Sequence, residues 1–386
     1  GSKIGARALM HAAGVPIVPG ATPRDQSDEG VLAAARGMGS SVLVKASAGG
    51  GGKGMRVVRQ DADAAEGIEA IGAARREAVA AFGDGTLYVE RLIERPRHVE
   101  VQIFADDHGN VVHLFERECS VQRRHQKVIE ESPSLAITAA VRQRMGEAAV
   151  AAARASGYRN AGTIEFLVAG EGESATFFFL EMNTRLQVEH PVTEAVAGVD
   201  LVRAQFIVAA GGHLPWTQAA LSQRGHALEC RIYAEDPAHG FLPQAGPLGL
   251  YREPSGPGVR IDAGVGEGDR VGVHYDPLLA KLVVHAETRE AARLRALSAL
   301  GNYPVLGTRT NIPFLIRLLD LPAFRDGRLH TGMIDEHLAE LTRQDEVPPE
   351  ALVAAAVATA PMTLTGGDHA ATPDGDPWSM LHRWGR

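Results

Sequence analysis

Hydrophobic and polar residues alternate along this chain with two different spacings, which separate expected helices from expected strands. Apolar positions three or four residues apart predict helices over residues 4–12, 28–36, 62–82, 138–157, 200–210, 289–300 and 311–319. Compact apolar runs predict strands over residues 41–46, 55–58, 87–90, 98–105, 111–118, 162–168 and 176–181, and short strands alternate with Gly/Pro turns from residue 225 to residue 284. Hairpins outnumber strand–helix–strand units, so the pattern favours an α+β fold with a largely antiparallel sheet.

The order of these elements divides the chain into four segments. Residues 1–17 hold the first helix and part of a proline-containing loop. In residues 18–92 the order strand, glycine run, strand, helix, strand predicts a small α+β lobe. Residues 93–341 carry the longer strands of a larger domain. Residues 342–386 contain two consecutive prolines and a Gly/Asp/Pro-rich tail, which predicts a linker or the start of a truncated domain.

The composition narrows the class of protein. Hydrophobic residues make up 45% and charged residues 22% of the 386 residues, as in soluble globular domains. The formal net charge of −8 argues against a general affinity for nucleic acid. Two cysteines cannot form a disulfide framework, so we expect a reducing compartment, either the cytoplasm or the mitochondrial matrix of a eukaryote. The longest apolar run, residues 351–360, is shorter than the ~20 residues of a membrane span.

A glycine run at residues 48–54 is the first candidate for chemistry. Its backbone N–H groups can wrap an anion, and Lys53 adds a positive charge. No Ser or Thr follows the lysine and a strand flanks the run, so it is neither a Walker P-loop nor a dinucleotide fingerprint. The alternative is a plain flexible hairpin turn. Lys45, at the end of the preceding strand, favours a nucleotide-binding lid.

Two carboxylates and an amide on neighbouring strands are the second candidate. Glu165 lies within an apolar strand, Glu181 ends the next apolar run, and Asn183 follows on the same face. A short loop joins the strands, so the side chains can converge. Oxygen ligands of this kind suit Mg²⁺ held with substrate phosphates. The alternative is that a buried Glu forms an ion pair with an arginine such as Arg185 or Arg231.

The loop at residues 181–194 is the third candidate because Asn, Arg, Gln, Glu and His crowd into it. Arg185 and Gln187 could hold a small oxyanion, with a bidentate contact from the arginine. Glu189 is placed to act as a base or to orient one. His190 precedes a proline, and we assign it no role.

A basic cluster at residues 119–127 follows a predicted strand. Such a cluster is usually a solvated run of charge. Here Gln122 and His125 could reach a ribose or a phosphate across a cleft, and we assign Cys119 to packing.

Together these residues resemble the biotin carboxylase component of biotin-dependent carboxylases, within the ATP-grasp superfamily. Five stretches carry the resemblance in the family's order: residues 49–58, 97–100, 119–127, 181–194 and 229–237. The resemblance implies an ATP-grasp fold with residues 18–92 as the lid subdomain and residues 93–341 as the ATP-grasp and biotin carboxylase C-terminal part. Residues 1–17 would link to an N-terminal domain that is absent from this sequence. Residues 342–386 would lead towards a biotin carrier, which is absent as well.

The resemblance also implies which residues bind the nucleotide and the metal. ATP would contact the side chains of Lys3, Lys45, His98, Gln122 and His125, the loop with Gly50, Gly51, Gly52, Gly54 and Met55, and, at the adenine, Glu90 and Ile93. Glu165, Glu181 and Asn183 would ligate Mg²⁺ or Mn²⁺. Cations are needed because a phosphoryl group in transfer carries charge on several oxygens.

In the reaction implied by the resemblance, ATP phosphorylates bicarbonate to carboxyphosphate, which breaks down to CO₂ and phosphate, and N1 of biotin is then carboxylated. Arg185, Gln187 and the backbone of Val188 would bind bicarbonate, and Glu189 would deprotonate it. Arg231 would stabilise the biotin enolate. The implied partners are a biotin carboxyl carrier and a carboxyltransferase subunit in an oligomeric complex, with no nucleic acid and no membrane.

The final acyl acceptor depends on that carboxyltransferase. Residues 273–284, 307–312 and 330–332 are most similar to the methylcrotonyl-CoA or geranyl-CoA type, with propionyl-CoA and acetyl-CoA types as alternatives. Two other functions compete with this interpretation. One is an ATP-grasp ligase that joins a carboxylate to an amine, and the other is a catalytically idle fragment with a role in assembly.

Overall fold

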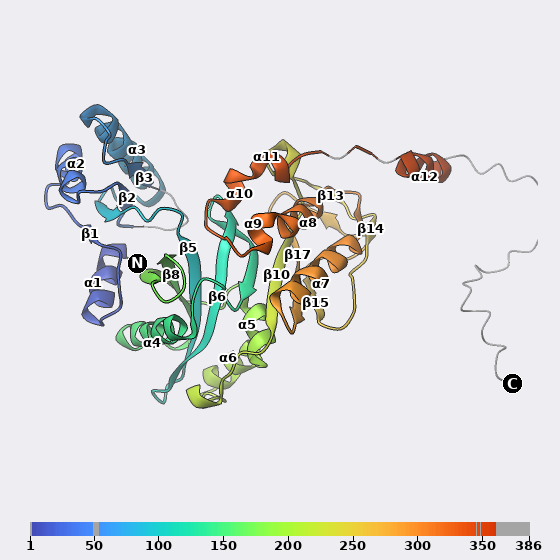
Figure 1. The fold of residues 1–386 in the computed structure, drawn as a ribbon, viewed down its shortest axis with the longest axis horizontal. Helices are drawn as coiled ribbons and strands as arrows, with labels where there is room; N and C mark the ends of the chain where they lie inside the picture. The colour runs from blue at the N-terminus through green and yellow to red at the C-terminus, as the bar shows by residue number, and fades with distance from the viewer. Residues whose placement is uncertain (1, 49–53, 345, 348, 360–386) are drawn as a thin grey trace, which may run out of the picture. The chain divides into compact units, whose positions relative to one another are not determined.

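The computed structural model describes residues 2–48, 54–344, 346–347 and 349–359 (Figure 1). Contacts divide the chain into two units, Gly1–Arg343 and Gln344–Arg386. In the second unit the described residues form one helix, α12 (Pro349–Thr359). None of the described helices is both long enough and apolar enough to cross a membrane.

A four-stranded antiparallel sheet forms the base of the small N-terminal lobe, with the order β1-β4-β2-β3. The elements are β1 (Gly20–Ala21), α2 (Asp28–Gly37), β2 (Val42–Ala46), β3 (Met55–Val58), α3 (Ala64–Phe82) and β4 (Leu87–Arg91). Both helices pack on the sheet through a shared apolar core that includes Val31, Val44 and Ile71. The predicted order of strand, strand, helix and strand is confirmed, while residues 49–53 of the glycine run lie outside the described residues.

Local sequence signals set the ends of the two lobe helices. The side chain of Ser27 accepts a hydrogen bond from the backbone N–H of Gly30 at 3.0 Å, and Asp63 does the same for Glu66 at 2.9 Å. Both residues therefore act as N-caps that satisfy free backbone donors. Helix α3 ends at Gly83, whose φ of +71° is a left-handed conformation that glycine adopts without a steric penalty.

We expect Gly54→Ala, at the end of the glycine loop, to destabilise the protein more than Gly83→Ala. Both glycines have a left-handed φ, +69° and +71°, so each alanine costs about 1–2 kcal/mol. A Cβ at residue 54 would also lie 3.0 Å from the Cβ of Ala46, whereas nothing lies within 4 Å at residue 83. The added crowding costs about 1–3 kcal/mol. Urea unfolding of both variants measures the difference, and equal losses would contradict the packing argument.

The larger part is built on an eight-stranded sheet with the order β15-β17-β10-β7-β6-β5-β8-β9, all of whose pairs are antiparallel. Its strands are β5 (Arg97–Ala105), β6 (Val111–Arg123), β7 (Gln126–Ser132), β8 (Asn160–Ala169), β9 (Thr176–Asn183), β10 (His226–Tyr233), β15 (Val259–Ala263) and β17 (Leu278–Ala286). The predicted α+β class with a mainly antiparallel sheet is confirmed.

Helices cover both faces of this sheet (Figure 1). An apolar core on one face joins α1 (Lys3–Ala12) and α4 (Ala139–Ala155) to β5, β8 and β9. On the opposite face lie α5 (His190–Ala197) and α6 (Leu201–Ala209). The C-terminal core contains α7 (Arg289–Gly301), α8 (Ile312–Asp320), α9 (Pro322–Arg325), α10 (Met333–Glu336) and α11 (Leu338–Leu341).

Short elements complete the C-terminal part. They are η1 (Gln218–Ala220), β11 (Glu235–Asp236), η2 (Pro237–His239), β12 (Leu242–Pro243), β13 (Gly246–Pro247), β14 (Leu250–Tyr251), β16 (Arg270–Val271) and β18 (Val305–Leu306). They form the two-stranded pairs β11–β12, β13–β16 and β14–β18. The predicted alternation of short strands and turns is confirmed here.

The prediction is wrong at the basic cluster of residues 119–127, and it also missed α5, which begins at His190 within the loop predicted over residues 181–194. The strand predicted over residues 111–118 continues to Arg123, and β7, which the pattern does not predict, pairs with it. Arg124 and His125 form the connecting turn with φ values of 48° and 66°. Glycine, asparagine or aspartate usually signals a two-residue turn of this kind, and none is present. Residues 119–122 of the cluster are therefore buried in a hairpin strand, whereas the turn residues Arg124 and His125 are exposed.

Candidate active site

One face of the large sheet carries buried charged side chains. The apolar positions of β5 pack beside α4, so His98, Glu100 and Gln102, which alternate with them, point to the opposite face. Sheet register places Glu100 opposite both Arg117 on β6 and Glu165 on β8, and Glu165 opposite Glu181 on β9. Carboxylates facing one another repel, so this row needs cations to be stable.

Arg117 supplies one of these cations at the inner end of the row. It is fully buried, and its Nε donates to Glu100 Oε1 at 2.6 Å. Its remaining N–H groups donate to the side-chain oxygens of Gln102, Thr163, Gln187 and Thr193, at 2.8–3.1 Å. The guanidinium therefore fixes the amide of Gln187, which was predicted to bind a small oxyanion.

Lys127 is the second cation and joins three carboxylates. Its Nζ lies 2.6 Å from Glu100 Oε2, 3.1 Å from Glu165 Oε1 and 2.5 Å from Glu189 Oε1. Burial lowers the pKa of Lys127, but the charges of these carboxylates, Glu100 first, outweigh burial and raise it well above the ordinary value. The lysine is therefore charged and holds Glu189 beside the carboxylate row.

Arg231 contacts the other side of Glu189. Its Nη2 lies 3.0 Å from Glu189 Oε2 and 2.5 Å from Glu130 Oε1, and its Nε donates to the same Glu130 oxygen at 2.6 Å. Glu189 has only 2% of its surface exposed. The predicted catalytic pair Glu189 and Arg231 is thus in direct contact, and the Glu189 carboxylate lies between two cations.

Glu165, Glu181 and Asn183, the predicted metal ligands, lie together at the edge formed by β8 and β9. The Nδ2 of Asn183 donates to Glu165 Oε1 at 2.8 Å, and the charges of Lys3 and Lys45 act on Glu181. Burial, followed by the charge of Glu165, raises the pKa of Glu181. Two facing carboxylates and an amide fit a divalent metal with oxygen ligands.

His98 also contacts Glu165, and its Nε2 lies 3.1 Å from Glu165 Oε2. Glu165 is therefore paired with His98 and Lys127. The expected alternative, an ion pair of a buried Glu with Arg185 or Arg231, is wrong for Glu165. The reason is register: β8 lies between β5 and β9, whereas Arg231 lies on β10, on the far side of β7.

Lys45 and Glu90, predicted to bind the nucleotide, meet inside the small lobe. Lys45 Nζ donates to Glu90 Oε2 at 2.8 Å, and both residues are 5% exposed. Arg7 of α1 contacts the other oxygen of Glu90. Lys3 begins α1, and its charge and that of Lys45 act on Glu181. Lys45 of the lobe and Lys3 of α1 therefore lie close enough to the edge formed by β8 and β9 for their charges to act on Glu181.

The remaining predicted residues lie around these groups. Gly50, Gly51 and Gly52 fall outside the described residues, while Gly54 is buried and Met55 begins β3. Gln122 is buried in β6, and Ile93 is half-buried just after β4. Val188 accepts a hydrogen bond from Lys281 through its carbonyl at 2.8 Å. Arg185 and His125 are exposed, and in this structure neither joins the buried network. His190 bonds to the Gln187 carbonyl at 2.8 Å.

Sequence reasoning missed the residues that hold the site together: Arg7, Glu100, Arg117, Lys127, Glu130 and Lys281. A charged residue at an interior strand position is a usable signal, because burying it without a partner is costly. Glu100 and Arg117 both lie within predicted strands. Their partners depend on register, which the pattern does not provide.

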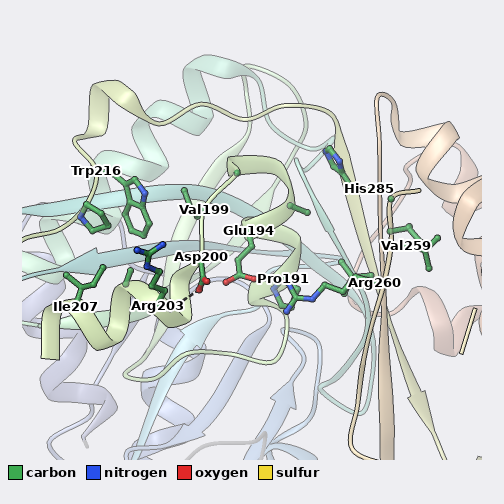
Figure 2. Close-up of a pocket in the computed structure, with 17 residues that line it drawn as sticks. Pro191, Glu194, Val199, Asp200, Arg203, Ile207, Trp216, Val259, Arg260 and His285 are labelled. Atoms are coloured by element: carbon green, nitrogen blue, oxygen red, sulfur yellow. Dashed lines mark hydrogen bonds and ion pairs between the residues drawn. The ribbon is translucent and has the colours of Figure 1, made fainter. Parts of the chain in front are cut away.

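A separate cavity of about 830 Å³ lies between α5, α6, β15 and β17 (Figure 2). Figure 2 shows Trp216 and Ile207 at one end of it and Val259, Arg260 and His285 at the other. None of the predicted site residues lines this cavity. The buried charge network, and not the cavity, therefore defines the candidate site.

Two family models match the chain. The first, described as carbamoyl-phosphate synthase L chain, ATP binding domain, matches residues 2–217. The second, described as biotin carboxylase C-terminal domain, matches residues 229–336.

Curated relatives and solved structures agree with these matches. The chain is 48% identical to a biotin carboxylase of Halalkalibacterium halodurans over 88% of its own length and 73% of that protein. It is 49% identical to the mitochondrial methylcrotonoyl-CoA carboxylase subunit alpha of Rattus norvegicus over 88% of its length, but spans only 47% of that relative. The biotin carboxylase domain of Hydrogenobacter thermophilus 2-oxoglutarate carboxylase, solved as a dimer with MgADP, ADP and bicarbonate, is 43% identical with a TM-score of 0.83, over 90% of this chain and 75% of that chain.

Proposed function

The chain belongs to the biotin carboxylase family, and from this premise we propose that it carboxylates N1 of biotin with ATP and bicarbonate. One observation carries the proposal. The buried carboxylate of Glu189 is held between Lys127 and Arg231, at 2.5 Å and 3.0 Å, next to the fixed amide of Gln187. A base flanked by cations suits a small anion that must lose a proton inside a water-poor site.

In the proposed first step, Glu189 removes the proton of bicarbonate, whose oxygen then attacks the γ-phosphorus of ATP to form carboxyphosphate and ADP. Arg185, Gln187 and the backbone of Val188 bind the bicarbonate. Arg117 supports this role because it holds the Gln187 side-chain oxygen at 3.1 Å, leaving the amide N–H₂ to face the anion and Glu165. Arg185 is exposed at the edge of the network, so we expect it to close on bound anion.

The nucleotide residues of the proposal are Lys3, Lys45, Gly50, Gly51, Gly52, Gly54, Met55, Glu90, Ile93, His98, Gln122 and His125. Mg²⁺ or Mn²⁺, held by Glu165, Glu181 and Asn183, would neutralise the phosphate charge during transfer. Lys45 supports a role at phosphate because it is buried and, among the described residues, pairs with one carboxylate, Glu90. The lid residues and the proposed metal ligands Glu165, Glu181 and Asn183 would then contact the same phosphate groups.

In the proposed second step, carboxyphosphate breaks down to CO₂ and phosphate, the released phosphate takes the proton from N1 of biotin, and the resulting nitrogen attacks CO₂. The negative charge that develops on the ureido oxygen of biotin is stabilised by Arg231. A guanidinium fixed by Glu130 and Glu189 cannot reorient, so its field acts on the oxyanion without a reorganisation cost.

We also propose roles for the segments of this chain and for its partners. We propose residues 1–17 as a linker helix, 18–92 as the lid, 93–341 as the catalytic part and 342–386 as a linker. Because the chain spans about half of its methylcrotonoyl-CoA carboxylase relative, the carrier, the carboxyltransferase and oligomeric assembly are also proposals. The 49% identity to that relative supports methylcrotonyl-CoA as the acceptor. Two free, buried cysteines support a cytoplasmic or mitochondrial-matrix location.

The direct test is Mg·ATP hydrolysis by this chain with bicarbonate, with and without free biotin. We expect hydrolysis that requires bicarbonate and yields carboxybiotin when biotin is added. Hydrolysis stimulated by an amine and a carboxylate, with no response to bicarbonate, would indicate a carboxylate–amine ligase. Absence of both hydrolysis and nucleotide binding would indicate an idle fragment.

We expect Glu181→Gln to remove most of the stabilisation that Mg·ATP gives the protein without lowering its stability in the absence of nucleotide. Gln cannot supply the negative oxygen that the metal needs, but it relieves the repulsion between Glu181 and Glu165. Thermal unfolding with and without Mg·ATP measures both effects. Glu173→Gln, at an exposed position of the same hairpin, is the control. An unchanged Mg·ATP response in Glu181→Gln would contradict the metal assignment.

A further inference from the structure

Two buried glutamates face each other behind the site. Glu130 on β7 and Glu229 on β10 are direct partners in the sheet register, and both are 0% exposed. Leu228, Cys230 and Ile232 point into the apolar core with α7 and α8. Glu229, which alternates with them, therefore points to the same face as Arg231, towards α5. The two carboxyl groups share one closed region of the interior.

These carboxyl groups have three oxygens without hydrogen bonds among the described residues. Glu130 Oε1 accepts from Arg231, but Glu130 Oε2 has no partner, and neither oxygen of Glu229 has one. Buried polar atoms are nearly always paired, so three orphaned oxygens on facing residues require an explanation.

The cations nearby are committed elsewhere. Arg231 is shared by Glu130 and Glu189. On β17, Lys281 Nζ donates to the Val188 carbonyl at 2.8 Å and lies 3.3 Å from Asp262 Oδ2. On α5, His190 is bonded to the Gln187 carbonyl, burial lowers the pKa of this imidazole, and Glu194 pairs with Arg260. No described cation pairs with an ionised Glu229.

We propose that Glu229 is a neutral carboxylic acid whose proton is donated as a hydrogen bond to Glu130 Oε2, which makes Glu229 a positioning residue for Arg231. The proton joins two of the three orphaned oxygens. Glu130 keeps its negative charge and its two bonds to Arg231, while Glu229 adds no charge. The protonation of Glu229 does not depend on the proposed function. Only its expected effect on biotin carboxylation rests on the proposed role of Arg231.

The consequence follows from charge. With Glu229 neutral, Arg231 faces two carboxylates, Glu130 and Glu189. With Glu229 ionised it would face a third, which would weaken the positive field at the biotin oxyanion and draw the guanidinium away from Glu189. Loss of the Glu229 proton should therefore reduce carboxylation of biotin while bicarbonate-dependent ATP hydrolysis changes less.

The pH dependence has a definite sign. Burial and then the charge of Glu130 raise the pKa of Glu229 well above the ordinary value. Between that ordinary value and the raised one, the folded protein holds a proton that the unfolded chain has lost. Stability therefore falls as pH rises through this interval, and Glu229→Gln should show a shallower fall.

The test compares Glu229→Gln with Glu229→Leu, with Glu287→Gln at an exposed position as the control. Infrared difference spectra of the whole chain should show a protonated carboxyl band that disappears in Glu229→Gln and persists in the control. At pH values above the ordinary pKa of a glutamate side chain, the melting temperature of wild type should fall more steeply with rising pH than that of Glu229→Gln. Glu229→Leu should lose roughly tenfold in biotin carboxylation relative to Glu229→Gln, because only Gln can still donate to Glu130.

Each outcome decides the proposal. An infrared band that persists in Glu229→Gln, or equal pH slopes of stability, would overturn the neutral acid. Equal carboxylation by the Leu and Gln variants would overturn the positioning role. If Glu229→Leu does not fold, the spectra and melting curves of Glu229→Gln still decide the protonation. The spectra and melting curves do not require an active enzyme. If the proposed function is wrong, wild type will instead show no bicarbonate-dependent ATP hydrolysis, so the two failures can be told apart.

Discussion

Glu189→Gln is expected to lower bicarbonate-dependent ATP hydrolysis and biotin carboxylation together by about 10²–10⁴, the range for a positioned general base. Gln has nearly the same shape as Glu but cannot accept the bicarbonate proton. Because hydrolysis requires carboxyphosphate, both activities should fall by the same factor. Steady-state assays of ADP and carboxybiotin measure the two activities in parallel.

The substitution also removes a negative charge between Lys127 and Arg231. A loss of folding could imitate a loss of catalysis, so Mg·ATP binding must be measured on the same sample. Binding should persist, because the proposed nucleotide residues do not include Glu189. Glu287→Gln should retain wild-type activity. A loss below tenfold in Glu189→Gln would contradict the assignment of this residue as the base.

Much of the fold is predictable from the sequence because its elements carry strong local signals. Helix α3 has an Asp63 cap, a long apolar period and Gly83 at its end, and the predicted and observed ranges differ by two residues. The hairpin of β6 and β7 was missed for the opposite reason. Its turn uses Arg124 and His125, and the stability of that turn comes from the pairing of buried strands.

The candidate site is less predictable because its parts meet through register. Motif residues such as Glu165 and Glu189 can be found from their unusual surroundings. Their partner Lys127 lies in a cluster that reads as surface charge, and only the fold of β7 brings its Nζ to both carboxylates. A local sequence pattern indicates whether a side chain at a given position is buried. It does not indicate which charged residue, distant in the sequence, pairs with a buried charge at that position.

Arg231→Met is expected to separate the two activities. Without the guanidinium, the biotin oxyanion loses its proposed partner, and carboxylation of biotin should fall by about 10²–10³, as when an oxyanion-hole donor is removed. Bicarbonate-dependent ATP hydrolysis should fall much less, because Glu189 keeps its contact with Lys127 at 2.5 Å. The ratio of carboxybiotin formed to ADP released measures this uncoupling.

The same substitution has a structural cost that must be separated from the kinetic effect. Met leaves Glu130 buried without a cation, and removing one partner of a buried ion pair costs about 3–5 kcal/mol of unfolding free energy. Arg231→Lys provides the matched control, since it keeps the charge. An ammonium lacks the second donor, Nε–H, that also bonds to Glu130, and it lacks the fixed plane of the guanidinium, so we expect stability near wild type and an intermediate ratio. A parallel loss of both activities in Arg231→Lys would show that Arg231 acts before biotin enters the reaction, in the formation of carboxyphosphate.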